Sequence, residues 1–207
     1  RRSVMSVQEK SGILLVDKPS GMTSHDVVAI IRRIYKTRQV GHTGTLDPMA
    51  TGLLVVLVGS AVKASEYLMS DRKSYRAGLR LGITTDTEDI SGNILSSADN
   101  LPCYSDIGKC IEFFRGPVYQ IPPMYSALKV GGKKLVDLAR KGVEIDREKR
   151  LVYIYRLELL GREGEDWLLD VTCSKGTYIR TLCSDIGKSL GCGGTMSFLR
   201  RTGCGCF

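Results

Sequence analysis

A loop rich in glycine surrounds a single carboxylate and has the clearest chemical potential in this sequence. The loop covers residues 41–52, and the carboxylate is Asp47. The loop also contains four residues with special backbone conformations, Gly41, Gly44, Pro48 and Gly52. Glycines permit sharp turns and close approach of a ligand to the main chain. A simple Asp-Pro turn, in which the Asp side chain binds its own backbone, is the commoner explanation of the same residues. The glycine and lysine spacing of a phosphate-binding loop is missing.

Arg180 is the second feature, because it stands near the start of a predicted helix. The apolar face of that helix consists of Ile179, Leu182 and Ile186, and Arg180 lies off this face. A cation near the positive end of the helix dipole is disfavoured by roughly 0.3–1 kcal/mol. A buried carboxylate would be a suitable partner and would itself stay ionised. A solvated surface arginine is the alternative interpretation.

Three tyrosines interleaved with cations form the third feature. They are Tyr75, Tyr125 and Tyr178, beside Lys73, Arg76, Lys129 and Lys175. Stacking on an unpaired base requires aromatic rings of this kind next to basic side chains. The period of its strand equally allows Tyr75 to be a core residue. Together the three features indicate a site with one carboxylate, one Arg and one stacking Tyr, and they leave hydrolysis, transfer and isomerisation open.

The charge balance of the 207 residues favours a polyanionic partner. Lys and Arg exceed Asp and Glu by 8, and the isoelectric point is about 9.2. A basic excess suits a nucleic acid, because each phosphate contact releases counterions. Many basic proteins nevertheless bind no nucleic acid.

The seven cysteines do not have the spacing of a metal site. The chain has no C-x-x-C pair and has two histidines, His25 and His42. We therefore expect no metal, and reduced thiols that lie partly in the core. A thiol enzyme that pairs a Cys with one of the histidines stays open, although no spacing favours it.

Apolar runs in the sequence are short. The longest, residues 53–58, is far below the length of a membrane span and predicts a buried strand. The basic N-terminal residues 1–5 are not followed by the apolar core of a signal peptide. We expect a cytoplasmic protein without a membrane partner, and a monomer.

Hydrophobic periodicity predicts a mixed order of strands and helices. Strands are expected at residues 13–16, 53–58, 75–81, 151–160, 167–173 and 196–200. Helices are expected at 24–36, around 107–114, at 133–141 and at 179–190. In the first helix we expect Ser24 as the N-cap and an apolar face of Val27, Ile30, Ile31 and Ile34. No regular alternation of strand and helix occurs, which favours an α+β fold.

Five ordered motifs closely resemble the family of bacterial tRNA pseudouridine synthase B, the tRNA pseudouridine-55 synthases. The motifs lie at residues 12–24, 41–52, 75–87, 123–129 and 174–180. The resemblance extends from about Gly12 to about Arg201. It implies an α+β pseudouridine synthase fold with a mixed, largely antiparallel central sheet flanked by helices. It also implies isomerisation of a uridine in the T loop of tRNA, without a cofactor or metal.

The resemblance also implies roles for individual residues. Asp47 falls on the catalytic aspartate, Tyr75 on the tyrosine that stacks on the target base, and Arg180 on the arginine paired with the aspartate. Lys63 matches a further active-site lysine. The positions that contact flipped-out RNA correspond to His42, Tyr178 and Leu199.

The C-terminal end departs from the family pattern. The family usually carries a small RNA-binding domain after the catalytic domain, whereas this chain ends at Phe207. We therefore expect residues 1–207 to form a single catalytic domain without that addition. Two alternatives remain: a catalytic subunit of a guide-RNA-directed pseudouridylation complex, and a non-catalytic tRNA-binding module.

Overall fold

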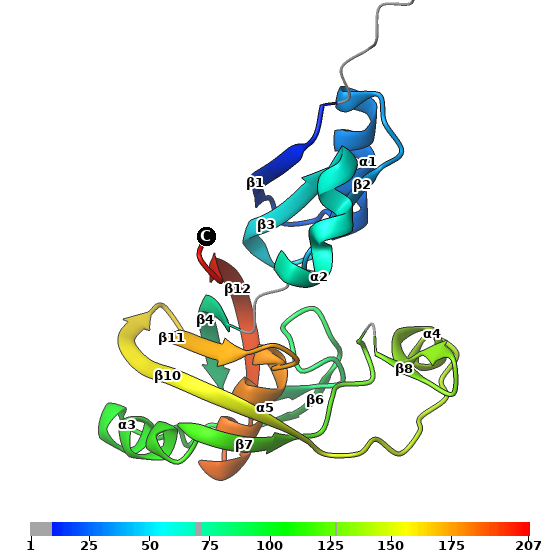
Figure 1. Ribbon diagram of the computed structural model, residues 1–207. Coiled ribbons are helices and arrows are strands. Elements are labelled where there is room, and N and C mark those ends of the chain that lie inside the picture. The colour runs from blue at the N-terminus through cyan, green and yellow to red at the C-terminus, as the bar shows by residue number, and fades with distance from the viewer. Residues whose placement is uncertain (1–9, 69–71, 127) are drawn as a thin grey trace, which may run out of the picture. The chain divides into compact units, whose positions relative to one another are not determined.

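Strand β3 organises the first part of the chain in the computed structural model (Figure 1), which describes residues 10–68, 72–126 and 128–207. The contacts divide the chain into two units, residues 1–71 with 200–207 and residues 72–199. In the first unit, β1 (Gly12–Lys18) pairs antiparallel with one edge of β3 (Thr51–Val58). The other edge changes partner along its length. It pairs with β2 (Val40–His42) at its end and with the last part of β12 (Gly194–Cys204), in parallel, at its start.

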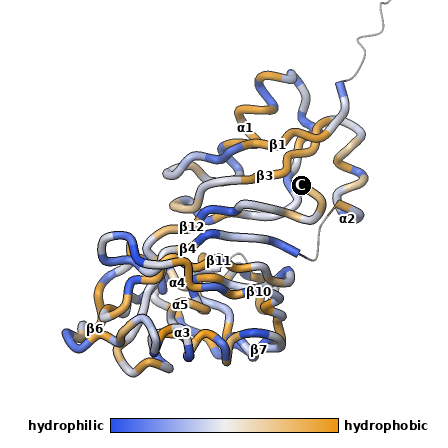
Figure 2. Tube along the Cα trace, turned by 90° about the vertical axis from the view of Figure 1, so that its left-hand side faces the viewer, coloured by the Kyte–Doolittle hydropathy of each residue, from blue (hydrophilic) through white to orange (hydrophobic). Residues whose placement is uncertain are grey.

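Both faces of β3 are covered, which explains its continuous apolar sequence (Figure 2). Helix α1 (Ser24–Tyr35) packs Val27 and Val28 against Leu54, Val56 and Val58 on one face. On the opposite face Val55 and Leu57 pack with residues of η1 (Gly59–Ala64), α2 (Ser65–Leu68) and the C-terminal end. A strand buried on two sides needs apolar side chains at every position.

The second unit is built on an antiparallel sheet. Its strands follow the order β12, β4 (Arg72–Leu81), β11 (Asp166–Ser174), β10 (Arg150–Glu163) and β7 (Gly116–Gln120). The pairs β4–β11, β11–β10 and β10–β7 are antiparallel. Two small hairpins accompany this sheet, β5 (Ile83–Thr85) with β6 (Ile94–Ser97) and β8 (Lys129–Val130) with β9 (Lys133–Lys134).

Two helices cover one face of this second sheet. Helix α3 (Tyr104–Glu112) contacts β10, helix α5 (Ile179–Ser189) contacts β4, and the two helices contact each other (Figure 1). Alternate residues of β11 are buried beneath them, among them Leu169 and Val171. Helix α4 (Leu135–Ala139) follows the β8–β9 hairpin. The α+β class and the mixed, largely antiparallel pairing are therefore confirmed.

Helix α1 differs from its prediction in two respects. Its N-cap is Thr23 and not Ser24, because Thr23 and Asp26 form a reciprocal capping box. The apolar face is also shifted: Ile30 and Ile34 are exposed, whereas Val28 is buried. Val27, Val28, Ile31 and Tyr35 pack against the core and also have helical spacing, so periodicity alone did not distinguish this face from the expected one.

The predicted helix at residues 133–141 is shorter than expected. Its first two residues form strand β9, and α4 covers Leu135–Ala139. Gly142 has a positive φ of 70°, as expected for a glycine beyond a helix end. Lys133 and Lys134 pair with β8 and are therefore not helical. Hydrophobic periodicity does not predict this strand pairing.

Some expectations fall outside the described residues, namely those on residues 1–5 and on Ala127 of the fourth motif. Across the described ranges, no helix is long and apolar enough to cross a membrane. The expectation of a single catalytic domain stays a prediction, since the two units reflect how contacts cluster within the chain.

Candidate active site

The predicted site residues are distributed over both units. Asp47, His42 and Lys63 belong to the first unit. The second unit contains Tyr75, Tyr178, Arg180 and Leu199.

The loop that carries Asp47 is fixed to the start of helix α1. The hydroxyl of Ser24 donates to the carbonyl of Leu46 at 3.2 Å and accepts from the amide of Leu46 at 2.9 Å. Leu46 itself is buried, and the amide of Ala50 closes a turn on the carbonyl of Asp47 at 3.0 Å. Asp47 is thus the first residue of a turn whose central residues are Pro48 and Met49, and it is half-buried. A carboxylate on a fixed main chain is preorganised for reaction.

Lys18 is a second anchor of this loop and lies at the end of β1 with no solvent exposure. Its ammonium group donates to the carbonyls of Pro19, Met22 and Pro48 at 2.8, 2.6 and 3.2 Å. Burial lowers the pKa of Lys18, and the negative charges of Asp47 and Asp26 oppose that shift. Sequence patterns did not identify Lys18 as an anchor. Its signal was a lysine at the inward-facing end of a strand, directly before a Pro-Ser-Gly turn.

His42 ends strand β2, and its ring meets the ring of His25 edge-on with centroids 6.4 Å apart. Among the described residues, none hydrogen-bonds its buried Nδ1 atom. Burial, with smaller contributions from the charges of His25 and Arg201, lowers the pKa of His42. The lowered pKa favours the uncharged form of the ring at neutral pH.

Lys63, the remaining site residue of the first unit, lies in the last turn of η1 and is exposed. An exposed lysine on a short helical turn has the reach and charge to meet a phosphate.

In the second unit, Arg180 is buried in the first turn of α5. Its guanidinium donates to the carbonyl of Thr87 at 3.1 Å and to that of Tyr125 at 2.7 Å. Its Nε atom lies 3.9 Å from a carboxylate oxygen of Asp89. The alternative of a solvated arginine is therefore wrong, and the guanidinium lies beside the carboxylate of Asp89. The partnership with Asp47 that the resemblance implies stays a prediction.

The loop that holds Arg180 is itself closely bonded. Asp89 accepts from the hydroxyl of Thr87 and the amide of Ser91, both at 3.0 Å. The neighbouring Glu88 accepts from the hydroxyl of Thr181 at 2.7 Å, and burial raises the pKa of Glu88. Loop and helix thus fix the direction of the Arg180 side chain together.

The two tyrosines of the second unit occupy different environments. Tyr75 lies on β4 opposite Val171, on the buried face of the sheet, and only 7% of its surface is exposed. Tyr178 directly precedes α5 and is half-buried. Its main-chain amide and carbonyl both bond to the side chain of Gln120, at 3.0 and 3.2 Å. Leu199 is buried on β12.

A thiol or metal site finds little support in the described residues. All seven cysteines are free, and five of them are buried. Burial raises the pKa of Cys173 to about 11, so it carries no thiolate at neutral pH. Within the three described ranges, no group of three or more His, Cys, Asp or Glu side chains is placed to hold a metal ion.

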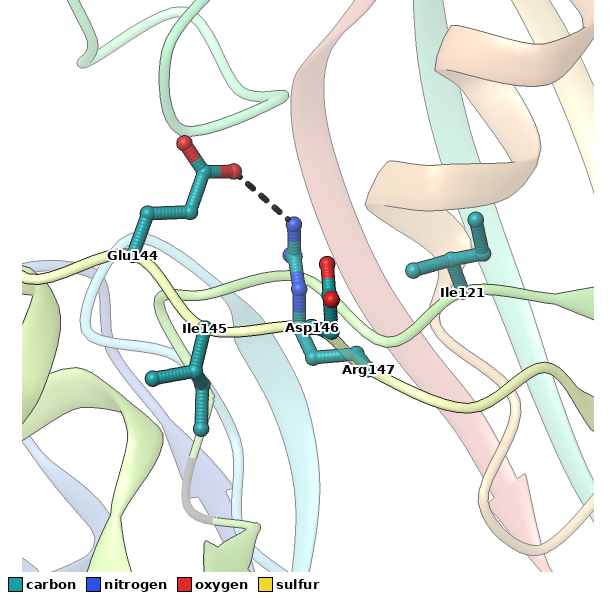
Figure 3. A pocket seen from close by; sticks show the side chains of 5 residues that line it. All are labelled: Ile121, Glu144, Ile145, Asp146 and Arg147. Atoms are coloured by element: carbon teal, nitrogen blue, oxygen red, sulfur yellow. Dashed lines mark hydrogen bonds and ion pairs between the residues drawn. The ribbon is translucent and has the colours of Figure 1, made fainter.

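A cavity of about 450 Å³ lies in the second unit. Its lining consists of Ile121, Glu144, Ile145, Asp146 and Arg147, and Arg147 is ion-paired with Glu144 (Figure 3). Because none of the predicted site residues lines this cavity, it carries no part of the candidate active site.

Family models match the chain over most of its length. The model described as TruB family pseudouridylate synthase, N-terminal domain, matches residues 32–179. The model described as tRNA pseudouridylate synthase B, C-terminal domain, matches residues 180–207.

Curated relatives give the same result. The tRNA pseudouridine synthase B of Alkaliphilus oremlandii is 54% identical over 192 residues, which cover 93% of this chain and 64% of the relative. That of Clostridium kluyveri is 51% identical over 196 residues, covering 95% and 68%. The chain thus spans about two thirds of the length of these relatives.

Solved structures confirm the expected fold. A chain in the crystal structure of a Cbf5–Nop10–Gar1 complex is 34% identical with a TM-score of 0.73, covering 93% of this chain and 48% of that chain. A chain in the structure of an H/ACA RNP bound to a substrate RNA containing 2′-deoxyuridine is 31% identical with a TM-score of 0.70, covering 94% and 47%.

Proposed function

Because the chain belongs to the TruB family of pseudouridylate synthases, we propose that it converts a T-loop uridine of tRNA to pseudouridine. The reaction breaks the bond between N1 of uracil and C1′ of ribose, turns the base, and joins C5 to C1′. The hydrogen of C5 is released, and N1 gains one. The observation that carries the proposal is the fixed turn that presents Asp47, at the position where the resemblance places the catalytic aspartate.

Asp47 acts as the catalytic carboxylate in this proposal. The bonds from Ser24 and Lys18 hold the main chain on both sides of Asp47. A carboxylate held in this way loses little freedom when the substrate binds, and so it can act as a nucleophile or general base efficiently.

The other residues have roles in binding and orientation. A loop uridine must leave its stack before its glycosidic bond can be reached. The uncharged ring of His42 would occupy the space that the base vacates, and Tyr75 would hold the detached base by its face. Arg180 supplies the positive charge that keeps the carboxylate ionised. Lys63 would be a further lysine of the active site. Tyr178 and Leu199, with His42, would contact the flipped-out RNA and help to exclude water from the open glycosidic bond.

The partner is tRNA, recognised through its T stem-loop, and the basic charge of the chain suits it. We propose that the protein acts in the cytoplasm as a monomer and without a metal or cofactor. Light scattering of the free protein measures the monomer state, and activity in excess chelator measures metal independence.

The direct test is incubation of the protein with an unmodified tRNA transcript, followed by mapping of pseudouridine in the product. We expect pseudouridine at one T-loop position and none elsewhere. A folded protein that leaves the T loop unmodified would overturn the proposal.

Two other functions make different predictions. Similarity to Cbf5 favours a guide-RNA-directed subunit, which would be inactive on free tRNA until a guide RNA and helper proteins are added. A non-catalytic tRNA-binding module would be unaffected by Asp47→Asn. The enzyme proposal predicts that this variant loses turnover and keeps most of its tRNA affinity.

A further inference from the structure

Arg201 is a buried arginine whose role the predicted site residues do not include. It lies on β12 in the first unit, and only 2% of its surface is exposed. Its guanidinium donates to three main-chain carbonyls: Nε to Leu53 at 2.6 Å, Nη2 to Gly44 at 3.0 Å and Nη1 to Thr45 at 3.5 Å. Two of these carbonyls belong to the loop that presents Asp47.

The position of Arg201 coincides with a gap in the hydrogen bonding of β3. One edge of β3 pairs with β12 as far as Gly52 and with β2 from Val56 onward. Between these ladders, the amide of Thr43 reaches the carbonyl of Val55 at 3.1 Å. The carbonyl of Leu53 is satisfied by the side chain of Arg201. The loop leaves the sheet at this gap, so the guanidinium joins the strand to the loop.

The three bonds use all three nitrogens of the Arg201 guanidinium. The guanidinium carries five N–H groups in a rigid plane, whereas a lysine carries its donors on one nitrogen. A buried carbonyl that loses its hydrogen-bond partner destabilises the folded state. Arg201 therefore stabilises a main-chain path that would otherwise leave polar groups unpaired beside the core.

Arg201 and Lys18 hold opposite sides of the same turn. Arg201 bonds the carbonyls of Gly44 and Thr45, before Asp47, and Lys18 bonds the carbonyl of Pro48, after it. The turn is thus clamped from both directions by donors that reach it from β12 and β1.

We propose that Arg201 is the positioning residue of the active-site loop, which it holds by the carbonyls of Gly44 and Thr45 so that the carboxylate of Asp47 meets its target atom. The proposal rests on the assignment of Asp47 as the catalytic carboxylate. It predicts that loss of the guanidinium lowers the rate of the chemical step and leaves tRNA affinity largely intact, because Arg201 contacts the loop and not the substrate.

The test compares Arg201→Lys and Arg201→Met with the wild type. We expect the single-turnover rate on saturating tRNA to fall roughly hundredfold for Arg201→Met and by at least about tenfold for Arg201→Lys, because small misplacements of a reacting group cost that much. The dissociation constant for tRNA should change by less than about threefold, as expected when binding contacts are unaltered. Amide exchange of residues 43–50 should accelerate, while β1 and β3 keep their protection.

Arg200→Met is the matched control. Arg200 is the neighbouring residue on the same strand, and it forms an exposed pair with Asp17 at 2.8 and 3.0 Å. The Arg200→Met substitution removes the same charge without removing a bond to the loop. The amide exchange of residues 43–50 and the single-turnover rate should therefore stay at the wild-type values.

Several outcomes separate the two proposals. Wild-type rate and loop exchange in Arg201→Lys would overturn the positioning role. So would global unfolding of Arg201→Met together with a fully active Arg201→Lys, since that result assigns the residue to stability alone. A wild type without pseudouridine activity would refute the proposed function, while faster loop exchange in the variants would still support the clamp.

Discussion

The loop around Asp47 and the first turn of α5 use buried cations in opposite ways. In the first unit, Lys18 and Arg201 direct their donors at main-chain carbonyls and thereby fix the backbone that carries a carboxylate. In the second unit, the carbonyls of Thr87 and Tyr125 fix a cation, Arg180, whose Nε atom lies near Asp89. In the first region, buried cations hold the main chain on which the Asp47 carboxylate is carried. In the second region, main-chain carbonyls hold the side chain of the cation itself, Arg180. The side chain of Asp47 should therefore be replaceable without loss of stability, whereas the side chain of Arg180 should not.

Asp47→Asn should give the largest effect, a loss of rate without a loss of stability. The substitution preserves the shape of the side chain, and the loop is held through its main chain, so folding should be unaffected. The rate of pseudouridine formation should fall by roughly a thousandfold or more, because a catalytic carboxylate is lost. Release of tritium from C5 of labelled uridine in tRNA measures the rate, and urea unfolding measures stability. A variant that loses rate and stability in parallel would contradict the distinction.

Arg180→Met tests the other side of the comparison. Removal of the guanidinium leaves Asp89 without its nearby charge and the two carbonyls without donors, so the free energy of unfolding should fall by about 3–5 kcal/mol. Urea unfolding measures the change. Arg156→Met is the control, because Arg156 is exposed and forms ion pairs with Glu158 and Asp170, whose loss should change the free energy of unfolding by less than about 1 kcal/mol. Equal stability of the two variants would contradict the view that Arg180 is structurally held.

Gly52→Ala sharpens the role of the contact between β3 and β12. Gly52 has a positive φ of 95°, and a Cβ atom there would collide with the main chain of Arg201. We expect a loss of about 2 kcal/mol in thermal or urea unfolding, from strain and overpacking together. Gly12→Ala on β1 is the control, since nothing lies near its added Cβ, and it should change stability by less than about 0.5 kcal/mol. If Gly52→Ala is as stable as the control, the close approach does not constrain the fold.

His42 gives the smallest expected effect, a dependence of stability on pH. Its folded-state pKa is lowered from the ordinary value of 6.5. As the pH falls below 6.5, His42 is protonated in the unfolded chain but stays neutral in the folded chain. The unfolded state therefore binds more protons, and the free energy of unfolding falls as the pH falls. In His42→Asn this part of the pH dependence should disappear, which urea unfolding at a series of pH values measures. If His42→Asn keeps the pH dependence of the wild type, the conclusion that burial lowers the pKa of His42 would be contradicted.

Local sequence patterns accounted for much of the fold. The apolar run of β3, the alternation of β4 and the helical spacing of α5 are visible in the local sequence. Each of these elements was predicted near its observed position. The errors fell where distant contacts decide. The capping box of Thr23 and Asp26 moved the start of α1 by one residue. Pairing with β8 converted Lys133 from a helical residue to a strand residue.

The candidate site shows the same division. Asp47 stands out in the sequence because glycines and a proline surround it, and Arg180 because a cation near a helix start is unfavourable. Lys18 and Ser24 were missed as anchors, since a lysine before a Pro-Ser-Gly turn and a serine at a helix start have many commoner explanations.

The five motifs, the α+β class and the turn around Asp47 could be recognised from the sequence alone. The contacts that hold this turn became visible only in the folded chain. The hydrogen bonds of Arg201 join residues 148 and 157 positions apart, from Leu53 and from Gly44. No local period encodes such a contact, because it depends on two strands that meet only after the chain has folded. Burial then makes the contact strong, since carbonyls hidden from water must find donors within the protein.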